Sequence, residues 1–127
     1  MAVIDPIADF LTRIRNSLKA LHKELYVPKS QIKLAIADIL LNEGYIKNYE
    51  ELERDIRIEL KYVQGTPAIK GLKRISKPSC RQYVGVKEIP NVQSGLGINI
   101  LSTSKGVMDG SKSREYHIGG ELLCQIW

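Results

Sequence analysis

The chain has 127 residues, of which 43% are hydrophobic, with a formal net charge of +5 and an isoelectric point of about 9.2. This length fits one domain or two small lobes, and this hydrophobic fraction argues against a disordered chain. The positive charge favours a phosphate-rich partner, although a soluble protein with surplus lysine has the same balance. The cysteines, Cys80 and Cys124, are too far apart for a zinc or redox motif. We expect each to be a small buried residue in a reducing cytosol.

No apolar run approaches the roughly 20 residues that span a bilayer, so we expect no membrane as a partner. The first residues lack the basic and then apolar regions of a secretory signal, and Asp5 and Asp9 argue against a transit peptide. We therefore expect a cytoplasmic protein. A chain encoded within an organelle stays an alternative.

A helix is predicted to begin at Asp5-Pro6, because Asp can cap exposed amides and Pro suits the first turn. Apolar residues then follow at helical spacing and predict one buried stripe: Ile7, Phe10, Leu11, Ile14 and Leu18. A second stripe on this helix has no carboxylate and consists of Thr12, Arg15, Asn16 and Lys19. It is either a solvated face or a ridge that contacts phosphates.

A short strand is expected from Glu24 to Val27, and Ser30 can cap a second helix that ends at Gly44. The predicted buried face of that helix consists of Ile32, Ala35, Ile36, Ile39 and Leu40. Lys29 and Lys33 flank its N-terminus, where the helix dipole attracts anions. The start of this helix is therefore a candidate anion site.

Alternation of apolar and polar residues predicts a strand over 56–63, and Gly65-Thr66-Pro67 ends it. A second strand over 69–75 could form a hairpin with the first. We expect the boundary between the lobes to lie between Gly65 and Pro78.

Further strands are expected at 81–86, 98–101 and 121–126. A helix over 109–116 is predicted to be weak, because Gly110 and several serines lower its propensity. Gly119-Gly120 predicts a tight turn.

The stretch from Lys61 to Lys87 contains no Asp or Glu. Its basic residues are Lys61, Lys70, Lys73, Arg74, Lys77, Arg81 and Lys87. Such a cluster indicates nucleic-acid binding better than net charge does, because counterion release rewards local charge. Tyr83 lies inside the stretch and could stack on a base, or could simply be a sheet residue.

The run Ser102-Thr103-Ser104-Lys105-Gly106 follows a predicted strand. Its hydroxyls both donate and accept hydrogen bonds, so they can recognise base edges and ribose hydroxyls, while Lys105 supplies a phosphate contact. Gly119-Gly120 could bring backbone amides close to RNA. Glu121 could accept from an exocyclic amine or anchor the hydroxyl loop. Without context, a Ser/Thr loop is more often only a turn.

Enzyme motifs fit the sequence poorly. Gly95-Leu96-Gly97 lacks the third glycine of a dinucleotide site, and Ser104-Lys105-Gly106 lacks the order of a P-loop. No spacing suits a metal site, and we expect neither a metal nor a cofactor. Two alternatives stay open: a small transferase that uses Ser104 or Cys124 with one of the two histidines, and a protein-binding adaptor.

Taken together, these segments resemble the bacterial-type small-subunit ribosomal protein eight family. The matching segments are Asp5 to Asp9, Leu11 to Asn16, Glu43 to Ile46, Gly95 to Ile98, Ser102 to Met108 and Gly119 to Glu121. They cover nearly the whole chain in the family's order, and the run Ser-Thr-Ser-Lys-Gly is the most specific. Lys77-Pro78-Ser79 departs from the family's frequent Arg-Pro-Gly, so we expect no glycine-specific turn here. The residues after Met108 are weaker helix formers than usual, so we expect a short or frayed helix.

The resemblance implies an α+β fold with an N-terminal α-β-α-β-β lobe (residues 1–65). A C-terminal, mostly antiparallel β lobe with one short helix (66–127) follows. It also implies a structural constituent of the small ribosomal subunit, not an enzyme, that binds the central domain of the small-subunit ribosomal RNA during assembly. Neighbouring ribosomal proteins would be further partners. Some members repress translation of their own messenger RNA, so that partner is an open alternative.

By the same resemblance, the main RNA-recognition loop consists of Ser102, Thr103, Ser104, Lys105 and Gly106. Tyr83 and Gly119-Gly120-Glu121 would lie beside it, and the basic stretch adds Lys77 and Arg81. The first helix would contribute a second RNA contact through Thr12, Arg15 and Asn16. Ser30 and Lys33 match the start of the family's second helix.

Overall fold

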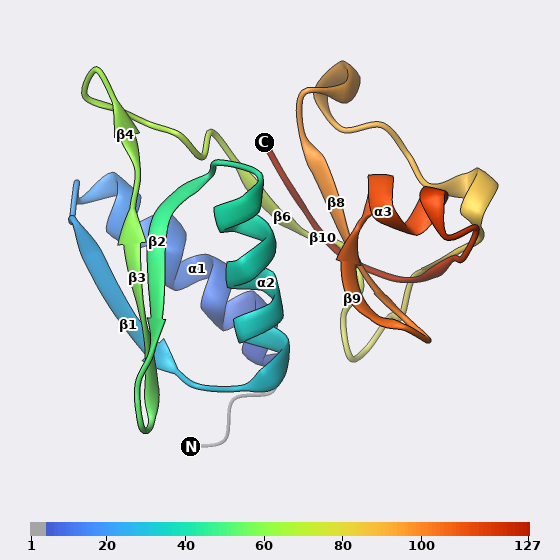
Figure 1. Ribbon diagram of the computed structural model, residues 1–127, viewed down its shortest axis with the longest axis horizontal. Coiled ribbons are helices and arrows are strands. Elements are labelled where there is room, and N and C mark those ends of the chain that lie inside the picture. The colour runs from blue at the N-terminus through green and yellow to red at the C-terminus, as the bar shows by residue number, and fades with distance from the viewer. Residues whose placement is uncertain (1–4) are drawn as a thin grey trace. The chain divides into compact units, whose positions relative to one another are not determined.

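The computed structural model describes residues 5–127, which form two compact units (Figure 1). The N-terminal unit spans Pro6–Lys70, and the C-terminal unit consists of Asp5 and Gly71–Trp127. The α+β class predicted from the sequence is confirmed. Residues 1–4 lie outside the described residues. They belong to the first predicted lobe and to the N-terminal segment in which we expect no secretory signal. Among residues 5–127, no helix is long and apolar enough to cross a membrane.

The N-terminal unit consists of two helices and a three-stranded antiparallel sheet. Its elements are α1 (Pro6–Lys19), β1 (Glu24–Pro28), α2 (Gln31–Asn42), β2 (Ile46–Glu51), β3 (Asp55–Leu60), β4 (Tyr62–Val63) and β5 (Thr66–Pro67). The sheet has the order β1-β3-β2, and both helices cover one of its faces (Figure 1). Ile56, Ile58 and Leu60 alternate toward the helices and are buried, which is the period-two pattern of a half-covered strand.

Local patterns predicted both helices. The apolar stripe of α1 is entirely buried, with Phe10 and Ile14 at 0% exposure. Ser30 caps α2 by accepting from the Lys33 amide at 3.3 Å. Gly44, at φ +80°, ends the helix, and the Gly44 and Tyr45 amides donate to Leu41 and Leu40. That pair of bonds needs a left-handed residue, which glycine adopts without side-chain strain.

The buried face of α2 is only partly as predicted. The structure buries Ile36 and Leu40 but also Lys33 and Ala37. Three members of the predicted face are only half-buried: Ile32, Ala35 and Ile39. A helix made mostly of apolar residues has no sharp stripe, so spacing could not locate its most buried line.

The predicted hairpin between 56–63 and 69–75 is wrong. β3 pairs with β1 and β2, whereas β6 (Leu72–Arg74) pairs with β10 (Gly120–Ile126) in the C-terminal unit. Between them lies only a short hairpin, β4 with β5, whose turn has positive φ at Gln64 and Gly65. Period-two spacing identifies a strand but says nothing about which strand pairs with it.

The C-terminal unit is mostly antiparallel sheet with one short helix, as predicted. Besides β6 and β10 it contains β7 (Tyr83–Val84), β8 (Ile98–Thr103), β9 (Gly106–Asp109) and α3 (Gly110–Glu115). The sheet has the order β6-β10-β8-β9, and β7 also pairs with β10. β10 is therefore the central strand, and its residues Leu122, Leu123, Cys124 and Ile126 are buried. At six residues, α3 agrees with the short helix expected after Met108.

Three local predictions in this unit were wrong. The strand expected over 81–86 is only β7, and Cys80 is exposed, although Cys124 is buried as expected. Gly119-Gly120 is not a tight turn: Gly120 begins β10, and the left-handed residue that reverses the chain is His117, at φ +55°. The two glycines instead allow neighbouring strands to approach closely.

Candidate nucleic-acid interface

A row of predicted RNA contacts crosses the C-terminal sheet. Tyr83, Glu121 and Ser102 lie in register on β7, β10 and β8. Residues in register point to the same face of a sheet. The next residues along these strands point to the opposite face, where Leu101 and Leu122 pack with Ile89. The row therefore lies on the outer face, and Tyr83 is 68% exposed there.

Gly119 and Gly120 allow the strands of this row to approach one another closely. A Cβ at Gly119 would lie 2.2 Å from the Val84 carbonyl oxygen. One at Gly120 would lie 2.2 Å from the carbonyl oxygen of Ser102. Both obstacles are backbone atoms, so neither can move aside. The glycines thus position β7 and β8 around β10, and their predicted contact with RNA stays a prediction.

The hydroxyl loop is the turn of the β8–β9 hairpin. Thr103 and Gly106 are the last pair of the ladder, and Ser104 and Lys105 form the turn between them. The Thr103 hydroxyl donates to the Gly106 carbonyl at 2.8 Å and accepts from the Lys105 amide at 3.1 Å. Gly106, at φ +112°, completes the turn. The Thr103 hydroxyl is therefore used inside the loop, while Ser104 and Lys105 are exposed at its tip.

Glu121 holds the segment that precedes Tyr83. Its Oε2 accepts from the Ser76 hydroxyl at 2.5 Å and from Arg81 at 2.8 Å. Ser76, which is fully buried, also accepts from the Gln82 amide at 3.0 Å. Burial by itself raises the pKa of the Glu121 carboxyl, but the Ser76 and Arg81 hydrogen bonds outweigh it, so the pKa lies below its usual value. The carboxylate thus anchors segment 76–82 rather than the hydroxyl loop.

Segment 76–82 presents the two basic residues predicted for the site. Lys77 and Cys80 exchange backbone hydrogen bonds of 3.1 and 3.0 Å, which closes a tight turn. Ser79 inside this turn does not have positive φ, so the turn does not require glycine. Lys77 is exposed, and Arg81 keeps half of its side chain exposed while it contacts Glu121. The segment therefore places two cations beside Tyr83: Lys77, which is exposed, and Arg81, which is paired with Glu121.

Sequence reasoning missed two residues of this surface, Lys112 and Tyr116. The Nζ atoms of Lys105 and Lys112 lie 5.3 and 5.9 Å from the centre of the Tyr116 ring. Lys112 and Tyr116 are four residues apart at the end of α3, a spacing that could have suggested their contact. Lys105 comes from the hairpin turn, and no sequence spacing links it to Tyr116.

The predicted site residues of the N-terminal unit divide into two groups. Thr12 and Asn16 are exposed on α1, and Arg15 is half-buried there. At the start of α2 the groups contact other parts of this unit: Lys29 pairs with Glu51 at 3.2 Å, and Ser30 caps the helix.

Lys33 is the most enclosed of the predicted cations. It is 5% exposed, and its ammonium donates to the Pro28 carbonyl at 3.1 Å. Burial lowers the pKa of Lys33, an effect that Asp9 opposes and Arg13 reinforces. The predicted anion site at the start of α2 is therefore assembled around intramolecular partners.

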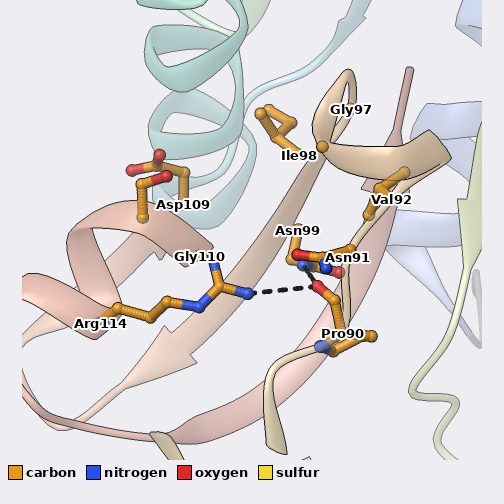
Figure 2. A pocket seen from close by; sticks show the side chains of 11 residues that line it. Pro90, Asn91, Val92, Gly97, Ile98, Asn99, Asp109, Gly110 and Arg114 are labelled. Atoms are coloured by element: carbon orange, nitrogen blue, oxygen red, sulfur yellow. Dashed lines mark hydrogen bonds between the residues drawn. The ribbon is translucent and has the colours of Figure 1, made fainter. Parts of the chain in front are cut away.

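A small pocket of about 80 Å³ lies beside α3 (Figure 2). Asn99 donates to the Pro90 carbonyl at 2.6 Å and accepts from Gln125 at 3.0 Å. Arg114 points into the same region and donates to the Pro90 carbonyl at 3.4 Å (Figure 2). It also donates to the Ile89 carbonyl at 2.9 Å. These bonds attach the loop around Pro90 to α3, so the polar groups of the pocket serve the fold.

Neither proposed nucleophile is suited to catalysis. Burial raises the pKa of the Cys124 thiol to about 12, so a thiolate is scarce at neutral pH. The Ser104 side chain has no hydrogen bond to a histidine among the described residues. Within residues 5–127, no group of three His, Cys, Asp or Glu side chains could hold a metal ion.

The fold and this surface define a class: a small basic α+β protein of two units, with a hydroxyl-rich cationic hairpin on an antiparallel sheet. Residues 5–127 match the family described as Ribosomal protein S8. A protein of Nitratidesulfovibrio vulgaris named small ribosomal subunit protein uS8 is 60% identical over 97% of this chain and 98% of its own length. Proteins of that name from Caldicellulosiruptor bescii and Acidobacterium capsulatum are 54% and 49% identical, with full coverage of both chains.

The chain therefore belongs to the ribosomal protein S8 family. This confirms the family resemblance drawn from the sequence. It also makes the chain a structural protein of translation and not an enzyme.

Proposed function

We propose that this protein is a component of the small ribosomal subunit in the cytoplasm, where it binds the central domain of the small-subunit ribosomal RNA during assembly. The observation that carries the proposal is the row formed by Tyr83, Glu121 and Ser102. Tyr83, the predicted stacking residue, thus lies on the same outer face of the sheet as Ser102, the first residue of the hydroxyl loop. Membership of the ribosomal protein S8 family supports the same partner.

Each part of this surface has a distinct task in the proposed complex. Tyr83 stacks on a base or ribose, since its ring is largely exposed. Ser104 donates to and accepts from base edges, because its hydroxyl lies at the loop tip. Lys77, Arg81 and Lys105 contact phosphates, and those contacts provide affinity rather than sequence preference.

Other residues act by holding these groups in place. Thr103 and Gly106 fix the turn. Glu121 braces Arg81, and the two glycines beside it let the strands approach. RNA recognition is then by a preformed surface, which lowers the entropy lost on binding.

The N-terminal unit provides a second RNA contact through Thr12, Arg15 and Asn16 of α1. Ser30 and Lys33 support this unit indirectly, because one caps α2 and the other bonds to Pro28. Neighbouring ribosomal proteins occupy other surfaces. The protein's own messenger RNA would bind the hydroxyl loop if it folds into a structure similar to the site in the central domain.

The proposal is tested by filter binding at physiological salt. One RNA is a fragment of the central domain, and the other is an unrelated hairpin of equal length. Specific recognition predicts a preference of about 4 kcal/mol or more for the fragment. Ser104→Ala should reduce that preference by weakening binding to the fragment much more than binding to the hairpin.

Two results would overturn the proposal. Equal, weak and salt-sensitive binding to both RNAs would leave only a basic surface without specific recognition. Failure to bind any structured RNA at low salt would favour a protein-binding adaptor instead.

A further inference from the structure

Tyr116 brings together two lysines from separate elements of the C-terminal unit. Lys105 comes from the β8–β9 turn and Lys112 from α3, and their ammonium groups lie 5.3 and 5.9 Å from the ring centre. Tyr116 is 45% exposed, so this cluster is open to solvent. It also adjoins the tip of the hydroxyl loop, because Lys105 belongs to both.

The two ammonium groups have no carboxylate partner among the described residues. Other cations of this chain do, among them Arg13 with Asp9 and Arg81 with Glu121. Two like charges near one ring repel each other, while the negative face of the aromatic ring attracts each of them. The arrangement thus concentrates positive charge that the protein itself leaves uncompensated.

We infer that Lys105, Tyr116 and Lys112 form a binding site for an RNA backbone phosphate, with Tyr116 as its positioning residue. The inference rests on the proposed function, which supplies the RNA. Lys112 contacts the phosphate from α3 while Lys105 contacts it from the hairpin. Tyr116 limits the freedom of both side chains before RNA arrives, so less conformational entropy is lost on binding.

The site extends the RNA surface beyond the hydroxyl loop and onto α3. A phosphate contact adds salt-dependent affinity and little sequence preference. Loss of Lys112 should therefore weaken binding to different RNAs to a similar degree. Loss of the Ser104 hydroxyl should instead weaken mainly the cognate complex.

The test measures the affinity of the full chain for the central-domain fragment over about 50 to 200 mM salt, a range in which phosphate contacts are separable. The variants are Lys112→Ala, Tyr116→Leu and Tyr116→Phe. Lys23→Ala is the matched control: it removes one exposed charge from the segment between α1 and β1, which has no assigned RNA contact. Thermal unfolding of each variant checks that the fold is retained.

Lys112→Ala should lower the slope of log affinity against log salt by about one, and Lys23→Ala should leave it nearly unchanged. Tyr116→Leu should weaken binding about two- to fivefold, because an exposed cation–π contact contributes that much. Tyr116→Phe should bind like the unchanged chain, because a phenyl ring keeps the attraction.

The phosphate site is overturned if Lys112→Ala matches Lys23→Ala, or if Tyr116→Leu matches Tyr116→Phe. In either case the proposed function stands, provided that the unchanged chain prefers the central-domain fragment and Ser104→Ala reduces that preference. If the unchanged chain shows no preference for the fragment, the proposed function itself fails.

Discussion

Two serine-lysine pairs of this protein have opposite surroundings. Ser104 and Lys105 are exposed at the tip of the β8–β9 hairpin, while their turn is closed by Thr103 and Gly106. Ser30 and Lys33 lie at the start of α2, where Ser30 caps the helix and Lys33 is 5% exposed. The residue types are the same, yet one pair is available to a ligand and the other is used by the fold.

The difference arises from which neighbour satisfies the polar groups. In the hairpin, the Thr103 hydroxyl makes the structural bonds, so Ser104 and Lys105 beside it are released from that task. At α2, the exposed helix amides and the Pro28 carbonyl are satisfied by the serine and lysine themselves. In this protein, the serine and lysine stay available to a ligand only where another group completes the local backbone bonds.

The largest expected effect concerns Gly120, which lets β10 approach β8 closely and so positions the β8–β9 hairpin. Gly120→Ala places a Cβ 2.2 Å from the Ser102 carbonyl oxygen. Because a backbone atom cannot yield, we expect a loss of about 3 kcal/mol in the free energy of unfolding, together with loss of specific RNA binding. Urea unfolding and filter binding measure the two effects.

Gly85→Ala is the matched control for that substitution. Its Cβ would meet the Glu88 carboxylate at 3.1 Å, which is the end of a flexible side chain. We expect a much smaller loss of stability. Equal destabilisation by both alanines would show that close strand approach at Gly120 is not what the hairpin depends on.

The second prediction concerns Glu121, which braces the segment next to the hairpin. Its pKa is lower in the folded protein, so its contribution to stability is present above the ordinary value of 4.5 and is lost as the pH falls through the folded pKa. Glu121→Gln removes the ionised acceptor of Ser76 and Arg81. We expect a loss of about 2 kcal/mol at neutral pH. Below pH 4.5 the difference between the two proteins should shrink, as measured by urea unfolding across pH. A constant difference over that range would contradict the lowered pKa.

The third prediction compares alanine substitutions at the two lysines, Lys33 and Lys105. Lys33→Ala removes a buried stem and leaves the Pro28 carbonyl without its donor, so we expect a loss of about 2 kcal/mol in unfolding free energy. Lys105→Ala should change stability by less than about 0.5 kcal/mol, as is usual at exposed positions. It should, however, weaken RNA binding. The reverse pattern would place the ligand-binding lysine at α2.

The sequence predicted what depends on neighbours along the chain. The buried stripe of α1, the Ser30 cap and the Gly44 terminus all follow from residues within a few positions of one another. It could not predict what depends on distant segments. The partner of β6, the backbone contacts of Gly119 and Gly120, and the Lys105 contact with Tyr116 are set by how strands and α3 come together.

The candidate site shows the same division. The hydroxyl loop was singled out by its residue types together with the family resemblance, and its contact with RNA stays a prediction. Of the two roles considered for Glu121, the anchor to the hydroxyl loop is not what the structure has, because its partners Ser76 and Arg81 lie 45 and 40 residues away in the chain. Lys33 was predicted to belong to an anion site at the start of α2, since spacing could not show that α2 buries this residue.

The smallest expected effect compares the two serines directly. Ser30→Ala removes the hydroxyl that accepts from the Lys33 amide, so the first turn of α2 loses one of its caps. We expect a loss of about 1 kcal/mol in the free energy of unfolding and little change in RNA affinity. Ser104→Ala should do the opposite, because the hydroxyl is exposed and makes no hydrogen bond within residues 5–127. Urea unfolding and filter binding on both variants give four values. Only a crossed pattern, in which each substitution changes one property, supports separate tasks for the two serines. If Ser30→Ala weakens RNA binding as much as Ser104→Ala does, then the helix cap is itself part of the RNA surface and the contrast between the two pairs fails.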